Sequence, residues 1–195
     1  MARIEVITGP MFSGKSEELI RRLRRATHAE QNVLVVKPKI DTRTERKIAS
    51  RRKKDNSEKG FEESDSFPAH EVGSAKELID LVTEHEPDIL AIDEAQFFQE
   101  WLLELITELL DRHESSNLTM IISGLDMDAW KKPFGIMPKL MAIADEVIKL
   151  TAVCFKCKKR PANLTYKGGG SSDKQIEVGS KIYSARCRTC HKLPE

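Results

Sequence analysis

Short apolar runs, rich in β-branched residues, alternate along the chain with segments in which apolar residues recur at helical spacing. The first run covers residues 4–7 and stops at a Gly-Pro turn. Residues 16–25 then place Leu19, Ile20 and Leu23 on one helical face. The opening of the chain therefore predicts a strand, a loop and a helix, in that order.

The same alternation continues to residue 153. The run 33–36 is continuously apolar and ends shortly before Pro38, which suits a strand covered on both faces of a parallel sheet. Because strands alternate with helices, the pattern predicts an α/β fold with right-handed crossovers. Further strands are predicted at 89–92, 118–123 and 147–153, and further helices after the capping residue Ser74 and over 102–110.

Two segments interrupt this alternation. Between Arg43 and Asp65, 14 of 23 residues are charged, so we expect a mobile charged loop within 43–70. A solvated insertion that only links two elements is the alternative interpretation. In the C-terminal tail, the glycine- and serine-rich stretch 168–172 separates two cysteine pairs.

Composition narrows the class of protein. With 195 residues, of which 39% are apolar, the chain can build one core domain with a small attachment. The formal net charge is only +1, which argues against a generally basic nucleic-acid or membrane-surface protein, so any basic patch must be local. We find neither an apolar run long enough to span a bilayer nor a signal sequence, and we expect a soluble cytoplasmic protein.

Residues 9–16 fit the spacing of a P-loop: glycine, four residues, glycine, lysine, serine. The segment lies between a predicted strand and a predicted helix, which favours the match over a chance glycine turn. Backbone N–H groups and the helix N-terminus can hold phosphates, Lys15 can reach the outer phosphates, and Ser16 can offer its hydroxyl to Mg²⁺. The predicted phosphate site consists of Gly9, Pro10, Met11, Phe12, Ser13, Gly14, Lys15 and Ser16.

Asp93 and Glu94 follow the apolar strand 89–92, at the strand end where parallel sheets bind ligands. Asp93 could hold Mg²⁺, and Glu94 could accept a proton from an attacking hydroxyl or water. An ordinary solvated acidic pair is the alternative interpretation. Beside a P-loop, the pair predicts one carboxylate for the metal and one for base catalysis.

The four cysteines form two Cys-x-x-Cys pairs, and four thiolates match a closed tetrahedral Zn²⁺ site. Metal binding would add folding free energy to a tail that is poor in apolar residues. Buried or redox-active thiols without metal are the alternative, and His191 is a possible substitute ligand. The predicted ligands are Cys154, Cys157, Cys187 and Cys190.

A P-loop followed by Asp93-Glu94-Ala95-Gln96 is also found in helicase-type ATPases, and zinc ribbons often contact nucleic acid. A helicase motor closes ATP between two such cores, however, and this chain has room for one. The net charge near zero also argues against a strand-binding groove. We therefore expect no nucleic acid and no membrane as partner.

Taken together, several blocks resemble the type II, zinc-containing thymidine kinases, from about Ile4 to His191. Besides the P-loop, the blocks are Asp41-Thr42-Arg43, Asp93 to Phe98, Lys132-Pro133-Phe134-Gly135, Lys149 to Cys154 and Cys187 to His191. The resemblance implies a RecA-like P-loop sheet flanked by helices in residues 1–150 and a small zinc-binding lasso domain in residues 151–195.

The resemblance also implies a function: transfer of the γ-phosphoryl group of ATP to the 5'-hydroxyl of thymidine in nucleotide salvage for DNA synthesis, with deoxyuridine as a second substrate. Glu94 occupies the position of the family's catalytic base, and ATP with Mg²⁺ and a structural Zn²⁺ are the implied cofactors. A homotetramer or homodimer is the implied assembly. The implied nucleotide site adds Asp41, Thr42, Arg43, Asp93, Glu94, Ala95 and Gln96 to the P-loop. The implied nucleoside site comprises Met11, Phe97, Leu125, Ala129, Phe134, Ile176, Glu177, Val178, Gly179, Ser180 and Tyr183.

The sequence departs from the family pattern at a few positions. Ala129 stands about where an aromatic residue is usual, so its neighbour Trp130 could take over the stacking role or the pocket is altered. A pair of glycines is represented by Val178-Gly179-Ser180, and Ala95 replaces a glycine of some members. By residue type alone, Met11, Phe97 and Phe134 would be assigned to core packing.

Overall fold

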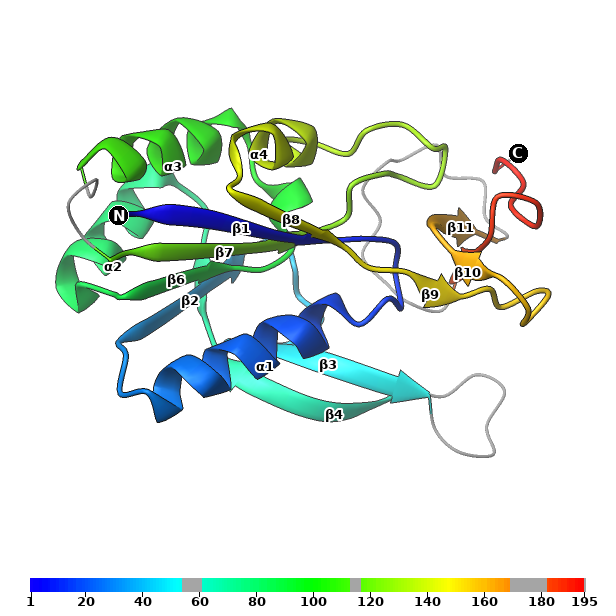
Figure 1. The fold of residues 1–195 in the computed structure, drawn as a ribbon, viewed down its shortest axis with the longest axis horizontal. Helices are drawn as coiled ribbons and strands as arrows, with labels where there is room; N and C mark the ends of the chain where they lie inside the picture. The colour runs from blue at the N-terminus through cyan, green and yellow to red at the C-terminus, as the bar shows by residue number, and fades with distance from the viewer. Residues whose placement is uncertain (54–60, 113–116, 169–181, 195) are drawn as a thin grey trace.

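The computed structural model describes residues 1–53, 61–112, 117–168 and 182–194. Its centre is a six-stranded sheet in which every pairing is parallel, as the alternation of strands and helices predicts (Figure 1). The strands lie in the order β5-β2-β6-β7-β1-β8, so β1 lies between β7 and the edge strand β8. They are β1 (Arg3–Thr8), β2 (Val33–Pro38), β5 (His70–Val72), β6 (Ile89–Ile92), β7 (Thr119–Gly124) and β8 (Glu146–Lys149).

Helices cover both faces of this sheet (Figure 1). α1 (Lys15–His28) packs on one face, where its buried Leu19, Ile20 and Leu23 join Ile7 and Val35 in one apolar cluster. The other face is covered by the remaining helices, and the Ser74 side chain accepts a hydrogen bond from the backbone N–H of Glu77, so the predicted cap is confirmed. These helices are α2 (Ala75–His85), α3 (Glu100–Arg112), α4 (Met137–Ile143) and the 3₁₀ turn η1 (Ala95–Phe97).

The prediction of a mobile loop within 43–70 is wrong for residues 47–53 and 61–68, which form two strands, while residues 54–60 lie outside the described part of the chain. β3 (Lys47–Lys53) and β4 (Phe61–Pro68) pair antiparallel and pack beside α1. A hairpin satisfies its backbone hydrogen bonds by itself, so it needs few apolar anchors. Here Ile48 is buried in the α1 cluster and Phe67 packs against it.

The C-terminal unit consists of short strand pairs that lie beyond the end of β8, outside the central sheet (Figure 1). The single strand predicted over 147–153 is wrong in extent, because β8 ends at Lys149 and the next strand pairs within the C-terminal unit. The change of direction lets the chain leave the sheet and build a separate small cluster around Cys154 and Cys187. Its strands are β9 (Ala152–Val153), β10 (Pro161–Ala162), β11 (Leu164–Lys167) and β12 (Tyr183–Arg186).

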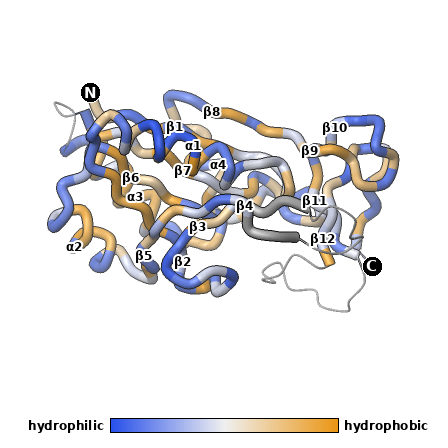
Figure 2. Tube along the Cα trace, turned by 90° about the horizontal axis from the view of Figure 1, so that it is seen from below, coloured by the Kyte–Doolittle hydropathy of each residue, from blue (hydrophilic) through white to orange (hydrophobic). Residues whose placement is uncertain are grey.

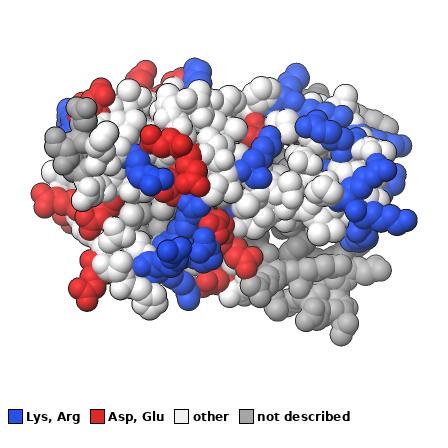
Figure 3. All heavy atoms as spheres, viewed as in Figure 1, with Lys and Arg blue, Asp and Glu red and all other residues white. Residues whose placement is uncertain are grey.

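Charged side chains are interspersed with uncharged residues on the surface, and few large apolar side chains of the described residues are exposed (Figure 3). Figure 3 shows acidic and basic side chains side by side on the face that carries α1, where Arg22 pairs with Glu5 and Glu18. Figure 2 shows hydrophobic stretches along β8 and β9, and these strands carry Val147, 40% exposed, and Val153, 61% exposed. No helix in the described part of the chain is long and apolar enough to cross a membrane.

Candidate functional site

The P-loop connects β1 to α1, as its spacing predicts. Two of its glycines are required by the backbone: Gly14 has φ 85° at the N-cap of α1, and Gly9 has φ 142°. A Cβ on Gly9 would lie 2.4 Å from the carbonyl oxygen of Leu150, closer than any side chain tolerates. The loop thus closes tightly against the end of β8, with the first turn of α1 behind it.

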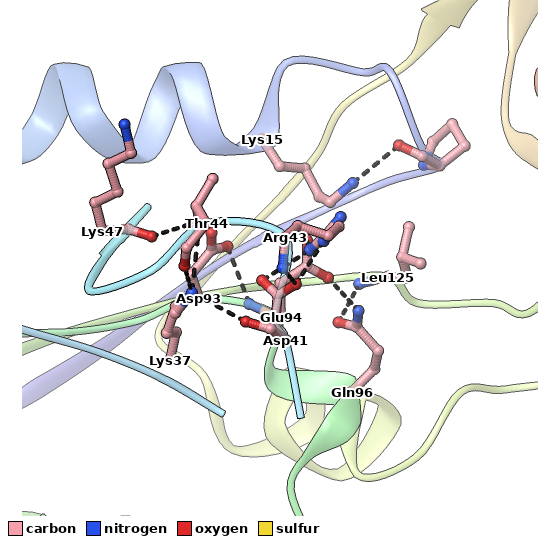
Figure 4. A network of polar contacts seen from close by, with 11 residues as sticks. Lys15, Lys37, Asp41, Arg43, Thr44, Lys47, Asp93, Glu94, Gln96 and Leu125 are labelled. Atoms are coloured by element: carbon pink, nitrogen blue, oxygen red, sulfur yellow. Dashed lines mark hydrogen bonds and ion pairs between the residues drawn. The ribbon is translucent and has the colours of Figure 1, made fainter. Parts of the chain in front are cut away.

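Lys15 bends back over this loop, and its Nζ donates a hydrogen bond to the carbonyl oxygen of Pro10 at 2.9 Å (Figure 4). Burial lowers the pKa of Lys15, while the nearby carboxylates of Glu94 and Asp93 act in the opposite direction. A partly buried ammonium near two carboxylates supplies positive charge of the kind that suits phosphate binding.

Asp93, which follows β6, is buried, and the next residue, Glu94, keeps only 13% of its side chain exposed, so the pair is not a solvated strand end. Burial, together with the neighbouring Glu94, raises the pKa of Asp93 to about 6. Burial also favours the protonated form of Glu94, but ion pairing with Arg43 and Lys15 holds the pKa of Glu94 below its ordinary value. The two adjacent carboxyl groups therefore differ in acidity, and Glu94 is the more acidic of the two.

Arg43 connects the segment after β2 to this acidic pair (Figure 4). Its Nε lies 2.6 Å from one carboxylate oxygen of Asp41 and its Nη2 lies 3.0 Å from the other, a two-point contact that fixes the guanidinium plane. Nη2 also pairs with Oε1 of Glu94. Burial works against the charge, but the two carboxylates outweigh it and raise the pKa of Arg43.

Gln96 ties Glu94 to the end of β7. Its Oε1 accepts a hydrogen bond from the backbone N–H of Leu125 at 2.9 Å, and its Nε2 donates to Oε2 of Glu94. Glu94 itself has φ 53°, in the left-handed region, so it needs support from its surroundings. The two oxygens of the Glu94 carboxylate are thus bound by Arg43, which follows β2, and by Gln96, which lies in η1.

One cleft collects most of the residues predicted from the sequence. It is lined by the P-loop from Met11 to Ser16, by Asp41 and Arg43, and by the acidic pair. Phe97 and Phe134 pack edge to face at 5.8 Å between ring centres, so they belong to the cleft wall and to local packing alike. The predicted nucleoside residues in this lining are Met11, Phe97, Leu125, Ala129, Phe134 and Tyr183.

Some predicted residues do not reach the cleft lining. Gly9, Pro10, Ala95 and Gln96 are buried and absent from the lining, and Thr42 is absent from it as well. The predicted lasso contacts Ile176, Glu177, Val178, Gly179 and Ser180 lie outside the described residues.

The structure also shows how the unusual Ala129 and Trp130 are arranged. Both line the cleft, and the ammonium of Lys167 lies over the Trp130 ring at 5.6 Å from its centre. The turn 128–132, which contains both residues, is held by Asp128. Its Oδ1 accepts hydrogen bonds from the backbone N–H groups of Trp130 and Lys132. An aromatic ring is therefore present at this wall, one position after the usual one.

Several cleft residues were missed by sequence reasoning: Thr44, Met127, Asp128 and Thr165. Asp128 carried a recognisable signal, since an aspartate followed by a short turn commonly binds its own backbone. Thr165 carried none, because its contribution depends on tertiary contact: its Oγ1 accepts a hydrogen bond from the backbone N–H of Met11 at 3.0 Å.

The four cysteines converge as predicted, with all sulfur atoms within 4.8 Å of one another and no disulfide among them. A tetrahedral Zn²⁺ with bonds of about 2.3 Å needs sulfurs about 3.8 Å apart, so the cluster fits the ion. Burial acts against ionisation of Cys154, but backbone N–H groups of Cys157 and Cys187 lower its pKa to about 6, toward the thiolate that zinc requires. His191 lies outside the cluster and its Nε2 donates to the carbonyl oxygen of Thr165.

Ser16 and Asp93 present a hydroxyl and a carboxylate to the same cleft. Oxygen donors of this kind suit Mg²⁺, which binds few protein groups and completes its shell with phosphate and water. The pKa of Asp93 is raised because its carboxylate is buried beside Glu94 with too little positive charge to compensate. A cation bound there would favour the ionised form of Asp93. The donor set therefore fits a magnesium–triphosphate complex.

Comparison with known proteins gives a consistent result. A family model described as "Thymidine kinase" matches residues 2–191. A thymidine kinase of Mycoplasma mobile is 43% identical over 189 residues, which cover 96% of this chain and 86% of that protein. A thymidine kinase of Mesomycoplasma hyopneumoniae is 41% identical over 192 residues, 97% of this chain and 95% of that protein. A solved structure described as a DNA replication initiation factor is similar with a TM-score of 0.41 and 10% identity, over 76% of this chain and 40% of that one, too low to bear on function.

Proposed function

The chain belongs to the thymidine kinase family, and from that premise we propose how its own residues phosphorylate thymidine at the expense of ATP. The P-loop holds the triphosphate through its backbone N–H groups, and Lys15 reaches the outer phosphates. Thymidine lies in the cleft between the P-loop and the aromatic pair Phe97 and Phe134. The 5'-hydroxyl then faces Glu94 and the terminal phosphate.

In the proposed reaction the 5'-oxygen of thymidine forms a bond to the γ-phosphorus, and the bond from that phosphorus to the bridging oxygen of ADP breaks. Glu94 takes the proton of the hydroxyl, for which its lowered pKa keeps it ionised. Lys15 and Arg43 offset negative charge on the transferring group. Mg²⁺, which Ser16 and Asp93 would hold, supplies further charge neutralisation on the phosphates when bound.

The observation that carries this assignment is the position of Glu94. It is partly buried in the cleft that also contains Lys15 and the predicted nucleoside residues, and Arg43 and Gln96 hold its carboxylate in a fixed direction. A base must be positioned before its acidity matters. Of the two adjacent carboxyl groups, the pKa of Glu94 is lowered and that of Asp93 is raised.

Four further assignments belong to the same proposal. Residues 1–150 form the nucleotide-binding domain and residues 151–195 the zinc-binding lasso domain, which supplies Tyr183 and Thr165 to the cleft. Deoxyuridine is a second substrate. A homotetramer or homodimer is supported by the apolar edge at β8 and β9, and a cytoplasmic location by four clustered cysteines that remain thiols.

The test is Glu94→Gln, which keeps the shape of the side chain and removes its basicity. We expect ATP binding to be retained and kcat for thymidine to fall by about 10²- to 10⁴-fold, the usual contribution of a positioned base. Glu104→Gln, an exposed carboxylate on α3, is the control and should leave kcat unchanged. Wild-type turnover in Glu94→Gln would refute the assignment. Release of ADP that responds to single-stranded DNA and not to thymidine would favour the helicase-type alternative.

A further inference from the structure

Lys37 is a fully buried lysine at the carboxyl end of β2. Its side chain is 1% exposed, and it follows the apolar residues of β2 on the face that carries α1 and Ile48. An ammonium group withdrawn from water is costly unless polar partners replace its hydration. The contacts of Lys37 therefore indicate what its burial accomplishes.

These contacts are concentrated on one short segment (Figure 4). Nζ of Lys37 donates to the carbonyl oxygen of Asp41 at 3.0 Å and also to the carbonyl oxygen of Thr44. Oγ1 of Thr44 lies 3.4 Å from the same nitrogen. Glu71, on the neighbouring strand β5, supplies a counter-charge, with its Oε1 3.5 Å from Nζ of Lys37.

The two carbonyls that Lys37 holds lie on either side of Arg43. Asp41 also holds the Arg43 guanidinium through both of its carboxylate oxygens, and Arg43 in turn contacts Glu94. The chain from Asp41 to Thr44 is otherwise a turn without regular structure, so its shape depends on such contacts. Loss of the ammonium would remove a contact from both ends of this turn at once, leaving the hydrogen bonds from the Asp41 N–H to Pro38 and from the Thr44 hydroxyl to Lys47.

We propose that Lys37 is a positioning residue for phosphoryl transfer: its buried ammonium clamps the backbone of Asp41 and Thr44 and thereby holds Arg43 against Glu94. This inference rests on the proposed roles of Arg43 and Glu94. Lys37 touches neither of these side chains in the contacts above, and it acts through the turn.

The main variant is Lys37→Met, which keeps the length of the side chain and removes its charge and donors. We expect kcat to fall by about 10- to 100-fold, since a displacement of about 1 Å at a reacting group has such an effect. The KM for thymidine and the number of ATP sites per chain should stay unchanged. Lys39→Met is the matched control, because it removes the same charge two residues away, where the ammonium makes only a surface pair with Glu77.

A double-mutant cycle separates positioning from simple stabilisation. If Lys37 acts through Arg43, then Lys37→Met in an Arg43→Gln background should change kcat by less than about twofold, because the group that it positions is gone. Equal losses in both backgrounds would overturn the inference and leave the function of Arg43 intact. Wild-type kcat in Arg43→Gln would refute the proposed role of Arg43 itself, and the inference would fall with it.

Glu71→Gln and Lys37→Gln complete the experiment. Glu71→Gln removes the counter-charge but leaves the two carbonyl contacts, so kcat should be unchanged; a loss equal to that of Lys37→Met would contradict the proposed clamp. Lys37→Gln keeps one amide donor and serves if Lys37→Met does not fold, with the same cycle against Arg43→Gln. Failure of both Lys37 variants to fold would assign Lys37 to stability alone and overturn the inference.

Discussion

Replacing Gln96 by leucine tests the buried bridge between Glu94 and β7. The side chain is 2% exposed, and it is the acceptor for the backbone N–H of Leu125 and a donor to Glu94. Leucine has a similar volume, so the substitution removes two hydrogen bonds without opening a large cavity. The change in stability therefore measures the polar bridge itself.

The expected magnitude follows from the two partners that are left behind. A buried N–H without an acceptor costs about 1–3 kcal/mol, and a hydrogen bond to a charged group contributes about 1.5–3 kcal/mol. Burial of the more apolar leucine side chain offsets about 1 kcal/mol of this. We therefore expect a loss of about 2–4 kcal/mol in the free energy of unfolding, or about 4–16 °C in Tm for a chain of this length.

Thermal unfolding followed by circular dichroism or calorimetry provides the measurement, with urea unfolding as an independent check. Gln99→Leu is the control, because Gln99 is exposed three residues later on the same segment. The two variants should differ by at least about 2 kcal/mol in the free energy of unfolding. A difference below about 0.5 kcal/mol, within the range of surface substitutions, would show that the bridge does not stabilise the fold.

Two further outcomes are expected. Cys187→Ser should lower bound zinc below one ion per chain, measured by atomic absorption, and should weaken thymidine use through the lasso domain; unchanged zinc content would contradict the four-cysteine site. Because burial raises the pKa of Asp93 to about 6, protonation of Asp93 should weaken Mg²⁺ binding as the pH falls through about 6. The Mg²⁺ concentration for half-maximal activity should therefore rise at low pH, and more Mg²⁺ should restore the rate. An activation constant for Mg²⁺ that is independent of pH between 5 and 8 would argue against Asp93 as the ligand.

The sheet could be predicted because its signals are local. The strands β2, β6 and β7 each contain a continuous apolar run, and the predicted strand 89–92 has the same bounds as β6. α4 was missed because it has only seven residues, too few to show helical spacing. The hairpin β3–β4 was missed because charge dominates its composition, while its stability comes from backbone pairing and from Ile48 beneath α1. Composition alone does not report pairing of this kind.

The candidate site was predictable where chemistry requires a fixed spacing. The P-loop and the cysteine pairs follow from the positions of a few residue types along the chain. Lys37 and Gln96 gave no comparable signal: one reads as the polar end of a strand, and the other as part of an acidic motif. Their contributions depend on backbone atoms of distant segments, the turn at Asp41 and the end of β7, which a single sequence does not bring together.

The C-terminal unit contributes to the phosphate site as well as to the nucleoside wall. The hydroxyl of Thr165 accepts the N–H of Met11, so this one P-loop amide is directed at β11 and not at the phosphates. Nε2 of His191, the residue after Cys190, donates to the carbonyl oxygen of the same Thr165. A metal that fixes Cys187 and Cys190 would thereby also fix the strand against which the P-loop rests. Zinc in this fold would thus act on the geometry of the P-loop, through two hydrogen bonds.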